Sequence, residues 1–271
     1  MKTRIITAAV GVAVLIALII FGSFYSIILT IALSLVSVLL CGEYLSARKL
    51  NKDIKLFIPC LLFALLIPLL SMTEAKYIPI YLFVLTVCIL AIAFHEKIKL
   101  DDAMFSIAGV FIITLPMAAL NVMACSDASH SAFWIIFNLG VPWLADTAAY
   151  FAGNYLGKHK LCPKISPNKT VEGAIAGVLG GTLSALLIGL IFKLIYGDVT
   201  VYYGVLLLVG FLASVASIFG DLTFSLVKRS CKIKDYGSIM PGHGGMLDRF
   251  DSVLFSIPLV YIFSQFFYLC V

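Results

Sequence analysis

Residues 225–251 hold a dense group of charged side chains between two long apolar segments. Lys and Arg side chains suit phosphate groups, and carboxylates suit a metal ion. The cations here include Lys228, Arg229, Lys234 and Arg249, and the carboxylates at the end of the segment are Asp248 and Asp251. A chain that only had to span a membrane would not need this density of charge. The segment is therefore the first candidate for an active site.

A glycine-rich turn, Pro-Gly-His-Gly-Gly over residues 241–245, lies between these charges. It cannot be helical, and its glycines let backbone N–H groups approach an anion closely. His243 in this turn could donate a hydrogen bond to phosphate. Alternatively, the glycines only let the chain re-enter the membrane. The flanking glycines and the Asp248-Arg249 pair that follows favour the functional interpretation.

The composition predicts an all-α, polytopic membrane protein. Of the 271 residues, 62% are hydrophobic and 12% are charged, and the mean hydropathy is +1.10. Soluble domains contain about a quarter charged residues. We expect a single integral membrane domain over residues 1–271, with spans one to five in 1–130 and spans six to nine, with the catalytic loops, in 131–271. The nine apolar segments lie near 5–21, 24–42, 56–72, 77–94, 104–125, 133–152, 172–196, 202–227 and 248–270.

Charge placement predicts the orientation of the spans. The first segment resembles a signal peptide, but a second span follows at once and no small-residue cleavage site is evident, so we expect an uncleaved helix. Of the 19 Lys and Arg residues, only Lys76 and Lys193 fall on the side opposite to the others. The positive-inside rule then predicts a cytoplasmic N-terminus and an outside C-terminus. The basic face suits anionic headgroups or substrates, and a role in topology alone is the alternative.

Four aspartates lie within or at the ends of the late spans, where ionisable side chains are costly. They are Asp146 in span six, Asp221 in span eight, and Asp248 and Asp251 at the start of span nine. One buried aspartate often only bonds a neighbouring helix, and Asp248 alone could be an N-cap. Helical spacing places Asp248 and Asp251 on one face and stacks Asp221 beneath Ser225. Converging carboxylates repel each other, and a hard cation such as Mg²⁺ relieves that repulsion.

The loop after span six, residues 153–173, is a second basic cluster. Ser166 and Lys169 precede a helix that Thr170 can cap, with Glu172 in its first turn. A helix N-terminus beside Lys and Ser/Thr side chains suits phosphate binding. A solvated basic loop is the alternative.

Other features favour structural roles. Gly173, Gly177 and Gly181 form a stripe on span seven that permits close helix packing, either within the chain or across a homodimer. Spans one to five contain no buried acid and no motif. The seven cysteines form no C-x-x-C pair, so zinc and disulfide roles are weakly supported.

At residues 225–251 the sequence matches the pattern of a known family. The pattern is Ser-x-apolar-Lys-Arg, four residues, Lys-Asp, a small residue, and x-His-Gly-Gly-apolar-x-Asp-Arg-apolar-Asp. Its fixed positions are Ser225, Lys228, Arg229, Lys234, Asp235, His243, Gly244, Gly245, Asp248, Arg249 and Asp251. The chain thereby resembles the phosphatidate cytidylyltransferase, or CDP-diacylglycerol synthase, family. The resemblance covers roughly residues 143–252, and it departs from the pattern at Met240, Asn168 and Phe224.

The resemblance implies a nucleotidyltransferase of phospholipid biosynthesis, which converts CTP and phosphatidic acid to CDP-diacylglycerol and pyrophosphate with Mg²⁺. It implies Asp221 and Asp248 as metal ligands, in a site that looks dinuclear in the family. The expected catalytic residues are Asp221, Asp248, Asp251, Lys228, Arg229, His243 and Arg249. The expected substrate-binding residues are Lys169, Ser166, Ser225, Lys234, Asp235, Gly244, Gly245 and Asp146. Which cations contact CTP and which contact the lipid phosphate stays open.

The expected setting is a bacterial inner (plasma) membrane with a cytoplasmic active site, membrane lipids as partners, a homodimer as an open alternative and no nucleic-acid partner. A transporter is a rival, but no inverted repeat is evident and the Lys-rich loops would be unexplained. Another CTP-using lipid enzyme, such as a polyprenol kinase, would attack the γ-phosphorus instead. Enzymes that consume CDP-diacylglycerol carry an Asp-Gly pair, which this sequence lacks.

Overall fold

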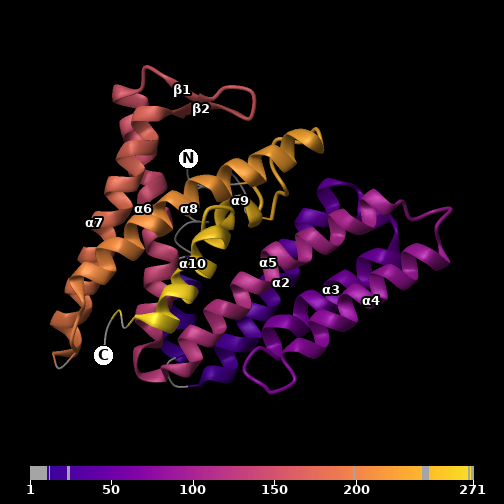
Figure 1. The fold of residues 1–271 in the computed structure, drawn as a ribbon, viewed down its shortest axis with the longest axis horizontal. Helices are drawn as coiled ribbons and strands as arrows, with labels where there is room; N and C mark the ends of the chain where they lie inside the picture. Colours follow the sequence, from indigo (N-terminus) through magenta and orange to yellow (C-terminus); the bar gives the residue numbers. More distant parts are fainter. Residues whose placement is uncertain are drawn as a thin grey trace. The chain divides into compact units, whose positions relative to one another are not determined.

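A computed structural model of the protein describes residues 11, 13–22, 25–197, 199–239, 244–267 and 269. Within these ranges the chain is mostly helical, and the only sheet is a two-stranded hairpin (Figure 1). Five helices are long and apolar enough to cross a membrane, and the same ranges contain four shorter apolar helices. The expectation of an all-α membrane protein is therefore confirmed. His243, in the glycine-rich turn, lies outside the described residues.

The chain divides into two compact units. Unit one comprises Met1–Ser131 and Cys231–Arg249, and unit two comprises Ala132–Ser230 and Phe250–Val271.

Unit one is built on four apolar helices that pack side by side (Figure 1). They are α2 (Ser26–Ala47), α3 (Ile54–Leu69), α4 (Tyr77–Ala93) and α5 (Leu100–Ser126). An apolar helix over Ala13–Gly22 precedes them, and short 3-10 turns lie at η1 (Leu50–Lys52) and η2 (Ala128–His130).

A buried polar chain joins these helices. The Oδ1 atom of Asn121 on α5 accepts a hydrogen bond from Thr30 Oγ1 on α2 at 2.9 Å. Its Nδ2 atom donates to Ser71 Oγ, just after α3, also at 2.9 Å. A polar side chain in an apolar medium must find partners inside the protein. Asn121 therefore fixes the register of three segments of unit one.

Unit two contains the late helices and the hairpin. These are α6 (Ser131–Leu156), β1 (Lys160–Cys162), β2 (Ser166–Thr170), α7 (Val171–Tyr196), α8 (Tyr203–Ser230) and α10 (Val253–Phe266). Helix α8 packs against both α7 and α10. The short α9 (Leu247–Phe250) lies at the division between the units.

The prediction of one continuous helix from residue 248 is wrong. Asp251 and Ser252 form a turn between α9 and α10. The ideal-helix argument that places Asp248 and Asp251 on one face therefore does not apply. Apolar composition marks the span but cannot show a break of two residues at its start.

The glycine stripe on α7 packs within the chain. A Cβ atom added at Gly177 would lie 3.0 Å from Ala149 Cβ, and one added at Gly181 would lie 2.9 Å from Ala145 Cβ. Both alanines are on α6, so small residues on the two helices allow close approach, as the stripe predicts. Because α6 already occupies the stripe, the stripe itself gives no argument for a homodimer.

We predict that Gly181→Ala destabilises the protein. The new methyl group would also lie 3.0 Å from Ser214 Cβ on α8, so two neighbours must move. Overpacking of this kind costs about 1–3 kcal/mol. Thermal unfolding in detergent measures the effect. Gly204→Ala is the matched control, because nothing lies within 4 Å of its added Cβ and alanine favours helix. Equal melting temperatures for the two variants would contradict the packing argument.

Candidate active site

Three of the predicted aspartates come together in unit two. The buried Asp251 carboxylate interacts electrostatically with Asp221 on α8 and with Asp146 on α6. Its Oδ1 atom accepts a hydrogen bond from the backbone N–H of Ser252 at 2.8 Å. The Ser252 hydroxyl in turn donates to Asp146 Oδ2 at 2.7 Å. The turn before α10 thus links two of the three acids.

Gly220 explains how α8 reaches this turn. A Cβ atom at Gly220 would lie 2.5 Å from the carbonyl oxygen of Asp251 and 3.0 Å from Phe255 Cβ. Only a residue without a side chain permits this contact. The Gly220-Asp221 pair therefore brings the backbone of α8 against the turn and sets Asp221 beside Asp251.

Asp221 has a cation and a hydroxyl as partners. Lys169 Nζ on β2 lies 2.5 Å from Asp221 Oδ2. The Ser225 hydroxyl, one helical turn along α8, donates to Asp221 Oδ1 at 3.2 Å. The predicted stacking of Asp221 and Ser225 is therefore confirmed. Lys228, further along α8, interacts electrostatically with Asp251. Unit two thus combines three carboxylates with two lysines.

The donor atoms of this cluster suit Mg²⁺ in type but are not arranged as a finished metal site. Carboxylate and hydroxyl oxygens are the ligands that a hard cation prefers. Across the described part of the chain, however, no group of three or more His, Cys, Asp or Glu side chains is placed to hold one ion. Asp221 instead pairs with Lys169, so a cation bound by Asp221 would have to share or displace this ammonium group.

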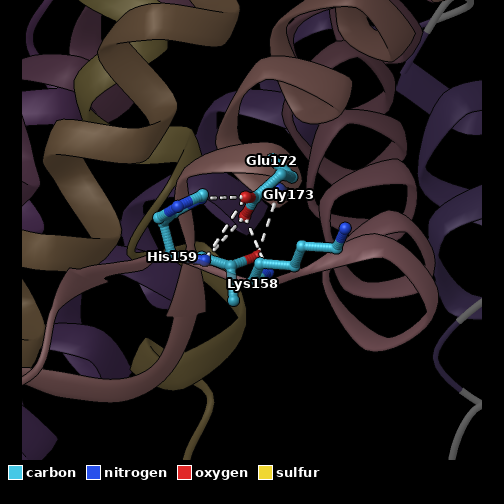
Figure 2. Close-up of polar contacts among 5 residues, drawn as sticks. Lys158, His159, Glu172 and Gly173 are labelled. Atoms are coloured by element: carbon cyan, nitrogen blue, oxygen red, sulfur yellow. Dashed lines mark hydrogen bonds and ion pairs between the residues drawn. The ribbon is translucent and has the colours of Figure 1, made fainter.

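The hairpin before α7 is closed at its base by Glu172 (Figure 2). Glu172 Oε2 accepts hydrogen bonds from the backbone N–H groups of Lys158 at 3.1 Å and His159 at 3.2 Å. The Nδ1 atom of His159 lies 2.6 Å from Glu172 Oε1. Thr170 Oγ1 accepts from the backbone N–H of Gly173 at 3.1 Å, which confirms the predicted N-cap. Glu172 therefore holds the hairpin onto the first turn of α7.

The hairpin also contacts the end of α8. Strands β1 and β2 are antiparallel, and Ser166 pairs with Cys162 near the tip. Arg229 Nε, in the last turn of α8, donates to the carbonyl oxygen of Ile165 at 3.3 Å. Together with the contact of Lys169 to Asp221, this places predicted basic residues from two segments in one region of unit two.

The described residues on either side of the glycine-rich turn, 234–239 and 244–248, form a loop of unit one that is organised around two carboxylates. Asp248 Oδ2 accepts hydrogen bonds from the backbone N–H groups of Tyr236 and Gly245, each at 3.0 Å. Glu43 on α2 accepts from the N–H groups of Met246 at 3.0 Å and Leu247 at 2.7 Å. The Glu43 side chain is buried. The loop therefore folds onto α2.

Glu43 contradicts the expectation that spans one to five hold no buried acid. Helix α2 continues to Ala47, beyond the expected end at residue 42, and carries Glu43 into the protein interior. Hydropathy ends a span at the first charge, whereas the partners of Glu43 lie about two hundred residues away. One signal was available, because Glu43 is the sole acid among residues 1–52.

Aromatic rings fasten the same loop. The Tyr44 ring on α2 stacks on Phe105 of α5, with centroids 4.4 Å apart, and on Tyr236 of the loop at 6.4 Å. The Tyr44 ring fills the space left by Gly109 on α5, where an added Cβ would overlap the ring.

The backbone at Gly244 in the same loop has φ +84°, a left-handed conformation that favours glycine.

The predicted residues therefore fall into two groups. Unit two holds Asp146, Ser166, Lys169, Asp221, Ser225, Lys228, Arg229 and Asp251, and unit one holds Lys234, Asp235, Gly244, Gly245, Asp248 and Arg249. Lys234, Asp235 and Arg249 have exposed side chains. The hydrogen bonds and the ion pair described above bring most of the predicted residues of unit two together.

The fold and these residues define a helical membrane protein in which carboxylates and basic side chains are gathered in the same unit. The chain belongs to the cytidylyltransferase family, whose family model matches residues 2–267. The family resemblance of residues 225–251 is thereby confirmed.

Curated relatives agree with this assignment. The chain is 35% identical over 167 residues to a phosphatidate cytidylyltransferase of Staphylococcus saprophyticus, covering 62% of this chain and 61% of the relative. It is 42% identical over 137 residues to that of Staphylococcus haemolyticus, covering 51% and 50%. It is 41% identical over 128 residues to that of Bacillus subtilis, covering 47% and 46%. The matched regions thus span about half to three fifths of these relatives' own lengths.

We predict that Thr170→Val loosens the hairpin, because valine keeps the shape but cannot accept the N–H of Gly173. Loss of an N-cap costs about 1 kcal/mol. Trypsin should then cleave faster at Lys160 and Lys164. Thr170→Ser should behave as wild type. Thr182→Val is the matched control on α7, where the hydroxyl bonds only within the helix. Unchanged cleavage in Thr170→Val would show that the cap does not hold the hairpin.

Proposed function

We propose that the protein is a phosphatidate cytidylyltransferase, which converts CTP and phosphatidic acid to CDP-diacylglycerol and pyrophosphate for phospholipid biosynthesis. The observation that carries the proposal is the family match over residues 2–267. The names of the curated relatives support the choice of substrates.

The reaction explains why the site needs cations more than a nucleophile. A phosphate oxygen of phosphatidate forms a bond to the α-phosphorus of CTP. The bond from that phosphorus to the oxygen bridging to the β-phosphate breaks, and pyrophosphate leaves. The attacking oxygen is already anionic at pH 7, so the protein needs no side-chain nucleophile. Its task is to align the two anions and to offset their charge.

The basic residues have this task in the proposal. Lys169, Lys228 and Arg229 come from the hairpin and the end of α8, and Lys234, His243 and Arg249 come from the glycine-rich segment. Lys169 pairs with Asp221 in the structure. A substrate phosphate can take over this ammonium group and leave the Asp221 carboxylate for a cation.

Asp221 and Asp248 are the proposed Mg²⁺ ligands, with a second metal ion as in the resembled family. Mg²⁺, when bound, supplies positive charge that offsets the triphosphate and the leaving pyrophosphate. Asp146 and Asp251 extend the acidic cluster around Asp221. The hydroxyl of Ser225 orients Asp221 through its hydrogen bond.

A direct assay tests the function. The purified chain is given mixed micelles of detergent and phosphatidate, Mg²⁺, and CTP labelled at the α-phosphate. The label should move into lipid while an equal amount of pyrophosphate appears. Release of labelled CDP instead would indicate attack at the γ-phosphorus and a lipid kinase. No turnover of CTP by the folded protein would remove the proposal.

We predict that Asp221→Asn and Asp248→Asn each reduce turnover at least about a hundredfold without unfolding the protein, because metal-based charge stabilisation amounts to several kcal/mol. Rates are measured at one fixed Mg²⁺ concentration, and size-exclusion profiles in detergent check folding. Asp101→Asn, an exposed acid in the first turn of α5, is the control and should keep wild-type turnover. Near-normal turnover in either test variant would exclude that residue as a ligand.

The proposed setting is an inner (plasma) membrane crossed nine times, with a cytoplasmic N-terminus and active site. The support is the charge asymmetry, since only Lys76 and Lys193 of the 19 Lys and Arg residues oppose it. A periplasmic reporter fused after Val271 should therefore be active, and a cytoplasmic reporter at the same point should be inactive. A cytoplasmic C-terminus on a functional protein would contradict this topology.

A further inference from the structure

Glu43 is a buried carboxylate whose hydrogen-bond donors are backbone N–H groups. Its side chain lies at the cytoplasmic end proposed for α2 and is 5% exposed. Its two oxygens accept hydrogen bonds from the N–H groups of Met246 and Leu247. Among the residues that the structure describes, no Lys, Arg or His forms an ion pair with it. Burying the Glu43 carboxylate costs free energy. A carboxylate at this position is therefore expected to have a role that a neutral side chain could not fill.

The loop is shaped closely around this carboxylate. A Cβ atom at Gly237 would overlap Glu43 Oε1 and lie 3.0 Å from its Cδ. A Cβ atom at Gly245 would lie 2.7 Å from Glu43 Oε2. The sequence suggested that the glycines of the 241–245 turn let backbone N–H groups approach an anion. At Gly245 the anion that the backbone approaches is Glu43, and Gly237, which lies before that turn, approaches the same carboxylate.

The same turn holds Asp248. The N–H of Gly245 donates to Asp248 Oδ2, and the next two N–H groups along the chain donate to Glu43. Tyr236, whose N–H also donates to Asp248, stacks on Tyr44, the neighbour of Glu43 on α2. Three consecutive backbone groups therefore tie the orientation of Asp248 to the position of Glu43.

We propose that Glu43 is a positioning residue that holds the 244–248 turn and so sets the orientation of the Asp248 carboxylate. The inference rests on the proposed function for its catalytic consequence, because Asp248 is a proposed Mg²⁺ ligand. The geometry of the turn itself does not depend on that function.

Glu43→Gln tests the role with almost no change of shape. Glutamine offers one acceptor oxygen and an NH₂ group, so one of the two N–H groups loses its partner and faces a donor. Leaving a buried donor unpaired corresponds to about a tenfold to hundredfold change in an equilibrium. We expect turnover to fall by about this factor and the Mg²⁺ concentration for half-maximal rate to rise several-fold. Glu96→Gln, at an exposed position in unit one, should change neither quantity.

Hydrogen exchange gives a readout that is independent of catalysis. In Glu43→Gln, peptides that cover residues 244–250 should exchange faster than in wild type, while peptides from α3 and α4 should not change. A general loss of protection would indicate a structural role for Glu43 and would overturn the proposal. If wild-type protein fails to make CDP-diacylglycerol, the proposed function fails, and the exchange comparison still decides whether Glu43 holds the turn.

A double-mutant cycle covers the case in which Glu43→Gln folds poorly. Gly237→Ala should be harmful in wild type, because the three atoms nearest to its new methyl group all belong to the Glu43 side chain. In a Glu43→Ala background that obstacle is gone, so Gly237→Ala should cause little further loss of protection or rate. Equal effects in the two backgrounds would overturn the proposal. If neither Glu43→Gln nor Glu43→Ala yields folded protein, the proposal is also overturned, because Glu43 then has a structural role.

Discussion

A carboxylate inside a membrane protein must find its hydrogen-bond donors in the protein, because the surrounding hydrocarbon offers none. Four acids of this chain meet that constraint in three ways. Glu43 and Asp248 accept from backbone N–H groups, Asp146 accepts from a serine hydroxyl, and Asp221 pairs with Lys169. Each solution requires a specific segment to come close, so the acids determine how the loops and turns fold.

Glycine makes these approaches possible. Gly220 lets α8 touch the turn that carries Asp251, while Gly237 and Gly245 let the loop enclose Glu43. Gly177 and Gly181 serve a different purpose, because they let α7 approach Ala145 and Ala149 of α6 closely. Glycine thus supports both helix packing and the placement of carboxylates in this chain. The atoms that an added Cβ would meet show which of the two roles a given glycine has.

Local geometry explains which parts of the structure the sequence could predict. The Thr170 cap and the contact of Ser225 with Asp221 depend on residues three or four positions apart, where helical spacing is a reliable guide. The membrane class followed from composition, and the family followed from a dense motif. The role of Glu43 could not be predicted in the same way, because its partners lie in a distant segment. The break at Asp251 was also missed, since hydropathy locates the apolar run that follows it but cannot show a two-residue turn at the start of the span.

The adjacent residues Lys169 and Thr170 serve two different helices. Lys169 reaches α8 through Asp221, and Thr170 caps α7. The separation of these two anchors is one peptide unit, about 3.8 Å between Cα atoms. An insertion between them would leave one helix without its contact, whereas added residues at the hairpin tip would spare both. The length of β2 is therefore fixed at its C-terminal end, and variation in chain length can be accommodated only at the tip.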